Sequence, residues 1–154
     1  MNLNSISNLL KHIEEPKIDL LVIDIYGNDF WILKKFIQEC KQEHKPNVIV
    51  VRYNHCFPSE ISVTVPFSKS ATRESPYHGA SLLAYCTMLQ DYRFIGCSLY
   101  GEVAVFIKED VVKDTTDPYL QPANVHHCFL YPNVQQHMRA HWPWLQKRML
   151  IKVI

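Results

Sequence analysis

The sequence predicts an α/β fold in which a mostly parallel sheet ends in an antiparallel hairpin. Two runs, LLVIDI at 20–25 and NVIVVRY at 47–53, are rich in apolar residues at both alternating positions. That pattern is typical of strands buried on both faces of a parallel sheet. Segments of helical period separate the strands. Two further apolar runs, 93–98 and 103–108, are joined by the tight turn LYGE, as in a hairpin.

Local signals place the elements in order along the chain. The helix after the first strand is expected to begin at Asn28 or Asp29, because both residue types cap helices. The stretch 54–78 is largely irregular, and loops of that length are usually functional or packed over another segment. The predicted elements are a helix at 4–15, a strand at 17–25, a helix at 30–44, a strand at 47–53, a helix at 79–89, and strands at 93–98 and 103–108.

The chain divides by composition into two parts. Residues 1–112 carry the α/β pattern and form the predicted domain. Residues 113–154 form a tail that contains Pro, His and Trp. A helix over 134–142 is expected in this tail, and Pro143 should break it. We interpret the tail as a contact extension.

Composition gives no argument for several functional classes. The formal net charge is +1, so no general attraction to nucleic acid or to an anionic membrane is indicated. No apolar run reaches the length of a membrane span. The four glycines form neither GxGxxG nor GxxxxGK[ST], so no phosphate-binding loop is present in the sequence.

The five cysteines suggest a reducing environment. They form no CxxC pair, their number is odd, and no signal-peptide pattern opens the chain. We therefore expect reduced thiols, most of them buried, in an intracellular compartment, either the cytoplasm or the mitochondrial matrix.

Five blocks of sequence carry a family resemblance: IDLLVIDIYGNDFWILK, VIVVRYN, FPSEISVTVPF, YHGASLLAYCTMLQDYRFIGCS and GEVAVFIKEDV. In order and spacing they resemble the distal half of FkbM-like methyltransferases, over roughly residues 3–112. These are class I enzymes that use S-adenosylmethionine. The resemblance implies a truncated Rossmann-like sheet with helices on both faces, whose strands are the fourth to seventh of a seven-stranded sheet.

The chain departs from this family where the cofactor and the reacting groups bind. No counterpart of the first three strands or of the glycine-rich cofactor loop is found, so we expect no bound cofactor. The family's turn resembles IDIDGND and its next strand end resembles VIEYN, so Tyr26 and Arg52 replace two carboxylates. The other residues expected at the crevice wall are Asp24, Gly27, Asn28, Asp29, Tyr53 and Asn54.

Each of these residues has a structural interpretation beside a functional one. Asp24, Asn28 and Asp29 could orient a substrate or act as a general base. Helix capping and hydrogen bonds to loop amides explain them without any ligand, and we favour that interpretation. Tyr26 and Arg52 form either a cation–π pair that plugs the crevice or two exposed loop side chains.

The histidines of the tail suggest a metal only weakly. His137 and His141 are spaced i, i+4, so one helix face could present both to zinc. The HHC run at 126–128 does not have finger spacing and no HExxH motif occurs, so surface or interface histidines are favoured. Ser81 lacks the GxSxG elbow of a nucleophile and is expected to begin a helix.

The sequence predicts a non-catalytic, methyltransferase-like accessory subunit, a pseudoenzyme, within an assembly of proteins. Its first strand has no predicted neighbour on one side, and no Lys or Pro between Leu20 and Ile25 blocks strand pairing. A hetero-complex is favoured and a homodimer is possible. The alternative is one half of a split methyltransferase that another chain completes. The predicted interface residues are Leu20, Leu21, Val22, Ile23, Trp142 and Trp144.

Overall fold

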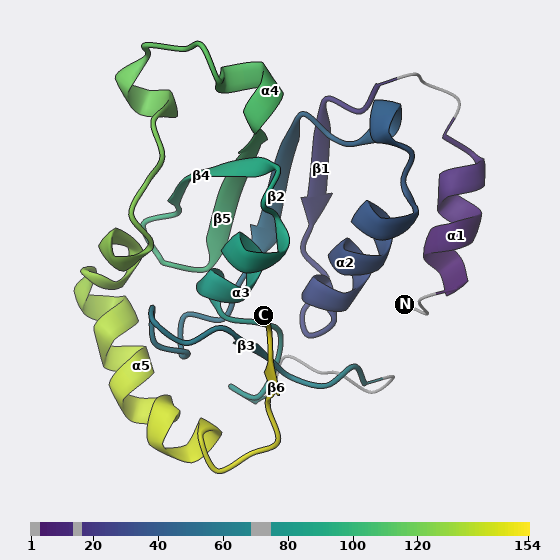
Figure 1. Ribbon diagram of the computed structural model, residues 1–154. Helices are drawn as coiled ribbons and strands as arrows, with labels where there is room; N and C mark the ends of the chain where they lie inside the picture. The colour runs from purple at the N-terminus through teal and green to yellow at the C-terminus, as the bar shows by residue number, and fades with distance from the viewer. Residues whose placement is uncertain (1–3, 14–16, 69–74) are drawn as a thin grey trace.

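A computed structural model describes residues 4–13, 17–68 and 75–154 (Figure 1). Its main sheet has four strands in the order β1-β2-β5-β4. β1 pairs parallel with β2, whereas β5 pairs antiparallel with both β2 and β4. Three of the strands therefore run in one direction, so the predicted mixed α/β class and the antiparallel hairpin are confirmed. The strands are β1 (Leu20–Ile23), β2 (Val48–Arg52), β4 (Tyr92–Cys97) and β5 (Val103–Lys108).

The hairpin's second strand lies inside the sheet rather than at its edge. β5 is inserted between β2 and β4, and its residues Ala104 and Phe106 are fully buried. A register shift between Phe94 and Gly96 of β4 adjusts the pairing. The last strand of the main sheet along the chain is therefore among its most buried.

Helices α2 and α3 lie on the same side of the sheet (Figure 1). Their apolar residues, such as Phe36 of α2 and Tyr85 of α3, share one core with Ile49 and Val51 of β2. α1 contacts α2, so Ile6 is also buried in this core. Within the described residues, no helix is long and apolar enough to cross a membrane. The helices are α1 (Asn4–Lys11), α2 (Asp29–Glu39), α3 (Leu82–Met88), α4 (Glu109–Val112) and α5 (Pro132–Leu145).

No described helix covers the opposite face of the sheet. Burial alternates along β1, because Leu20 and Val22 are 55% and 57% exposed whereas Ile23 is 6% exposed. Val48 and Val50, which lie beside Leu20 and Val22 in β2, are only partly buried. The prediction of helices on both faces is therefore wrong for the described part of the chain. An apolar sheet face remains open to solvent.

The tail folds back onto the domain and pairs with the long loop that follows β2. Its last strand, β6 (Ile151–Lys152), pairs antiparallel with β3 (Val63–Thr64) of that loop. The predicted helix break at Pro143 is wrong, since α5 continues to Leu145. Pro143 lies in the last turn of α5. The missing amide donor there removes one hydrogen bond near the end of the helix and leaves the preceding turns intact. The amide of Gln146 still donates to Trp142 O at 3.0 Å.

A disulfide joins the tail to the sheet, which corrects the expectation of five reduced cysteines. Cys97 at the end of β4 is bonded to Cys128 in the 3₁₀ helix η3 (Val125–Phe129). Cys40, Cys56 and Cys86 are free thiols, and burial raises the pKa of Cys56 and of Cys86 to about 11. The cysteines therefore no longer argue for a reducing compartment.

Candidate functional site

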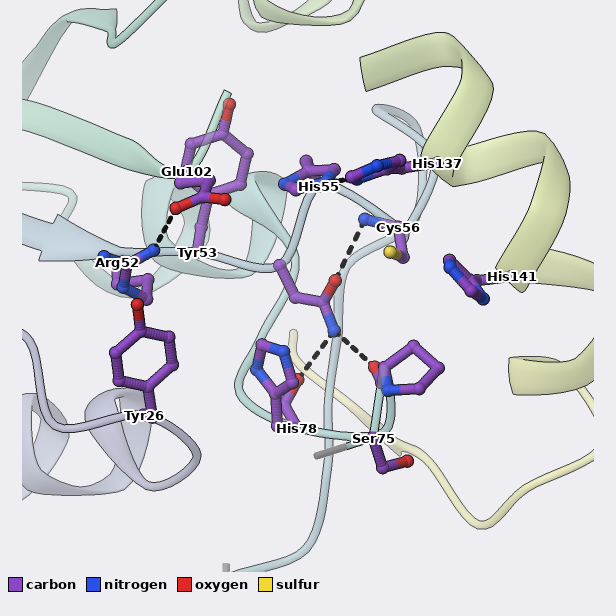
Figure 2. Close-up of a pocket in the computed structure, with 12 residues that line it drawn as sticks. Tyr26, Arg52, Tyr53, His55, Cys56, Ser75, His78, Glu102, His137 and His141 are labelled. Atoms are coloured by element: carbon purple, nitrogen blue, oxygen red, sulfur yellow. Dashed lines mark hydrogen bonds and ion pairs between the residues drawn. The ribbon is translucent and has the colours of Figure 1, made fainter. Parts of the chain in front are cut away.

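A cavity of about 320 Å³ lies at the carboxyl ends of β1 and β2, beside α5 (Figure 2). The turn after β1 supplies Tyr26 and the end of β2 supplies Arg52. The loop after β2 supplies His55, and α5 supplies His137 and His141. Parallel strands end at the same edge of a sheet, so the fold brings these distant residues together there.

Arg52 is held by two carboxylates and an aromatic ring. Its guanidinium makes two hydrogen bonds to Asp24, at 2.6 and 3.1 Å, and a third to Glu102. It also lies 4.3 Å from the centre of the Tyr26 ring, so of the two alternatives for this pair the structure has the cation–π contact. The hydrogen bonds from Arg52 to Asp24 and Glu102 raise the pKa of Arg52. Both carboxylates are therefore ion-paired with the same guanidinium.

The backbone of Tyr26 is strained. Tyr26 has a φ of 47°, and no other non-glycine residue in the described part of the chain has a positive φ. A bulky side chain in this left-handed region costs about 1–2 kcal/mol. The following Gly27 has a φ of 109°, so the turn needs two consecutive positive φ angles. Contact with Arg52 offsets part of this cost.

Asp29 and Asn28 make hydrogen bonds within the chain, but neither forms the side-chain helix cap that the sequence predicts. Asp29 is buried and its carboxylate accepts a hydrogen bond from the Ile25 amide at 3.0 Å. Burial raises the pKa of Asp29, and the hydrogen bond from Ile25 opposes that shift. Asn28 occupies the N-cap position of α2 without a side-chain cap. Its amide instead makes two hydrogen bonds to the backbone of Ser68.

Asn54 organises the long loop rather than facing a ligand. Its Nδ2 donates to the carbonyls of Pro76 and His78, at 2.7 and 2.8 Å. Its Oδ1 accepts from the amide of Cys56 at 2.9 Å. Ser81 begins α3 as predicted, because its Oγ accepts from the Ala84 amide at 3.2 Å. The polar groups around the cavity are thus largely used to hold the loop in place.

His55 is the site residue that sequence reasoning missed. It is 9% exposed, and its Nε2 lies 2.9 Å from Nδ1 of His137. The burial of His55, together with the nearby His137, lowers the pKa of His55 to about 4. A histidine in the loop segment NHC gives no local sign of a partner on a helix in the tail, so no sequence signal identified this pair.

The histidines do not form a metal centre in the described parts of the chain, where no group of three or more His, Cys, Asp or Glu side chains could hold an ion. The rings of His137 and His141 are 6.2 Å apart and nearly perpendicular. His126 instead forms a hydrogen bond of 2.7 Å with Ser59.

The predicted interface residues fall into two groups. Leu20 to Ile23 form an edge strand, since β1 has β2 as its single neighbour in the sheet order of the described residues. Trp142 packs within the chain against Phe57. Trp144 is 39% exposed, with Arg148 lying 4.2 Å from its ring centre. Tyr53 is buried, and its hydroxyl has no hydrogen-bond partner in the described structure.

Comparison of the chain with family models, curated proteins and solved structures finds no match. The resemblance to FkbM-like methyltransferases therefore stays a prediction. The structural features that bear on function are the edge of the sheet at β1 and the cavity beside α5.

Proposed function

We propose that this chain is a non-catalytic, methyltransferase-like accessory subunit that binds another protein through β1. One observation carries the proposal. The outer edge of β1 has no strand partner among the described residues, and Leu20 and Val22 on the uncovered face are more than half exposed. An apolar edge strand without a charged or proline guard templates association with another strand.

The adjoining sheet face extends this surface. Val48 and Val50 of β2 and Val105 and Ile107 of β5 occupy the same face and are only partly buried. Burial of apolar area contributes about 25 cal/mol per Å², so covering this face together with the edge would stabilise a complex. A partner that adds a strand beside β1 and packs over this face satisfies both features at once, which favours a hetero-complex.

The cavity supports the non-catalytic part of the proposal. Arg52 joins Asp24 and Glu102 in one ion-paired group, with Tyr26 stacked on its guanidinium. In this arrangement Asp24 and Glu102 share one positively charged partner. It is consistent with a crevice wall that has lost its catalytic groups, as the substitution of Tyr26 and Arg52 for two family carboxylates predicts.

A split methyltransferase is the second candidate, and the open edge of β1 favours it as well. In that arrangement another chain adds the missing strands beside β1 and brings the cofactor loop. The two proposals share the docking surface but differ in whether the completed complex binds S-adenosylmethionine.

A photo-crosslinking amino acid at position 22 tests the docking surface in extracts of the native source. Position 111 is a matched control, because Val111 of α4 is 56% exposed and Val22 is 57% exposed. We expect a defined crosslinked partner from position 22 and none from position 111. The change Val22→Lys should weaken association with the purified partner more than tenfold, because it places a charge in an apolar contact, whereas Val111→Lys should have little effect.

Calorimetry with S-adenosylmethionine separates the two candidates. The isolated chain should not bind it more tightly than the millimolar range, about 4 kcal/mol. Binding by the purified complex alone would favour the split enzyme. Tight binding by the isolated chain would overturn both proposals, as would a stable monomer in which the β1 amides are protected on both edges.

A further inference from the structure

The two rings of the His55–His137 pair point directly at one another. Their facing nitrogens are 2.9 Å apart and their ring centres are 5.1 Å apart, with 24° between the ring planes. The separation of the centres is close to the nitrogen–nitrogen distance plus the two ring radii. The two nitrogens and the two ring centres are therefore nearly in line, which is the geometry of a direct N–H···N hydrogen bond.

This geometry leaves room for one proton between the two facing nitrogens. A neutral imidazole has one N–H donor and one bare nitrogen, so two neutral rings can share a single proton between the facing nitrogens. When both rings are imidazolium, both facing nitrogens carry a proton and repel one another. The same alignment disfavours a shared metal ion, because the two lone pairs face each other instead of converging on a third point.

The pair lies where the tail is attached to the sheet. His55 lies three residues after the end of β2, and His137 is in α5. The helix also docks through Val134, which contacts Gly101, and through Trp142, which packs on Phe57. Its two ends are tethered independently, by the Cys97–Cys128 disulfide on one side and by the pairing of β6 with β3 on the other. The hydrogen bond therefore holds the middle of a helix that is fixed at both ends.

The charged surroundings of His55 favour its neutral form. Burial is the largest cause of its lowered pKa, followed by repulsion from His137, with a further contribution from His78 in the loop. Glu102 and the Gly101 backbone, at the start of β5, act in the opposite direction. The carboxylate of Glu102 is already paired with Arg52.

The other titratable neighbours do not change this balance. The Cys56 thiol beside His55 is kept neutral by burial, which raises its pKa to about 11. His141, one turn along α5, faces His137 from the same helix, with 6.2 Å between the ring centres.

We propose that the His55–His137 pair is a pH-sensitive latch for α5. The helix is docked while the pair holds one proton between its facing nitrogens, and its middle comes away when both rings are protonated. Undocking uncovers Phe57 and the face of α5 that carries Val134, both fully buried in the docked state. This inference is independent of the surface at β1.

Amide hydrogen exchange of the full chain tests the latch. Protection of residues 132–145 is compared with protection of residues 103–108 in β5, at about pH 7 and about pH 4.5, after correction for intrinsic rates. The pKa of His55 is about 4 when α5 is docked, and we take the ordinary value of 6.5 for the undocked state. Linkage therefore predicts that α5 loses up to about 60-fold more protection than β5 on acidification.

Two variants and one control make the result specific. His55→Gln should reduce this extra loss to a few-fold. His137→Gln should reduce it only in part, because burial alone still lowers the pKa of His55, and it changes an exposed position, so it should fold. His127→Gln changes an exposed histidine of the same tail and should behave as wild type. An unchanged loss in both pair variants would overturn the proposal. Equal loss in α5 and β5 would also overturn it, because the pair would then affect only global unfolding.

Discussion

The two edges of the main sheet are protected in different ways. Along β4, the tail supplies a hydrogen bond from the Ala123 amide to Phe94 O, at 2.8 Å, and the disulfide from Cys128 to Cys97. Along the outer edge of β1, no described segment supplies a strand partner. Figure 1 shows the tail descending beside β4 toward α5, far from β1. The same chain therefore seals one edge and leaves the other open.

The way in which the tail seals β4 explains why it does not also seal β1. Proline has no amide donor, so a segment that contains Pro118 and Pro122 cannot form a continuous ladder with a strand. The tail protects β4 through isolated contacts instead. The Arg93 guanidinium donates to the carbonyls of Val112 and Leu120, at 3.2 and 3.1 Å. An apolar edge such as β1 is better matched by a regular strand, which a separate chain can supply.

The sharpest way to break this comparison is to remove the disulfide. The double change Cys97→Ser and Cys128→Ser should destabilise the protein by about 3–4 kcal/mol, because the bond closes a loop across a sequence separation of 31 residues. Urea denaturation of the two proteins measures the difference. Hydrogen exchange should rise along β4 and change little along β1, whose edge the tail does not touch.

Thiol counting is the control for that experiment. In the denatured, non-reduced protein, three cysteines should react with an alkylating reagent, namely Cys40, Cys56 and Cys86. Five reactive thiols would show that the disulfide is absent from the purified protein, and the contrast between the two edges would then lose its strongest element.

The strands were predictable because their signal is local. The run at 20–25 and the hairpin around Gly101 are each specified by alternation of residues over a few positions, which sequence alone displays. The stacking of Tyr26 on Arg52 was one of two alternatives that the sequence left open for these residues. These features require no knowledge of how distant segments meet.

Features that depend on distant segments could not be predicted in this way. The partners Cys97 and Cys128 have no motif spacing, and His55 and His137 are separated by 82 positions. The insertion of β5 between β2 and β4 and the uncovered sheet face are likewise properties of the assembled sheet. Pro143 misled because a proline rule for helix interiors was applied to a residue in the final turn.

Two glycines, Gly101 and Gly79, test how tightly α5 is attached on the β4 side of the sheet. A methyl group on Gly101 would collide with Val134 of α5, at a φ of 65° that favours glycine. Gly101→Ala should therefore destabilise the protein by about 2–4 kcal/mol, from overpacking together with backbone strain. Gly79→Ala is the matched control, because Gly79 has a φ of 62° and open space around it. It should cost only about 1 kcal/mol from strain.

Thermal or urea unfolding of the two glycine variants measures the difference. Equal losses would mean that α5 moves aside without cost. The β4 side would then be as tolerant as the β1 side, contrary to the tight attachment of the tail that the structure shows.

The smallest effect is expected in the turn that follows β1. Tyr26→Asn should relieve about 1 kcal/mol of left-handed strain, since Asn tolerates this conformation. It should also lose about 0.5–1 kcal/mol of cation–π contact with Arg52. The two terms oppose each other, so the free energy of unfolding should change by no more than about 0.5 kcal/mol. A double-mutant cycle with Arg52→Met isolates the contact, and its coupling should be about 0.5–1 kcal/mol.

Tyr100→Asn, in the exposed hairpin turn, is the control without a cation–π partner among the described residues. A loss above about 1 kcal/mol for Tyr26→Asn alone would mean that the stacked ring stabilises the wall of the cavity more than its strain costs. The β1 side would then be a rigid site in its own right and not simply a tolerant edge that awaits a partner.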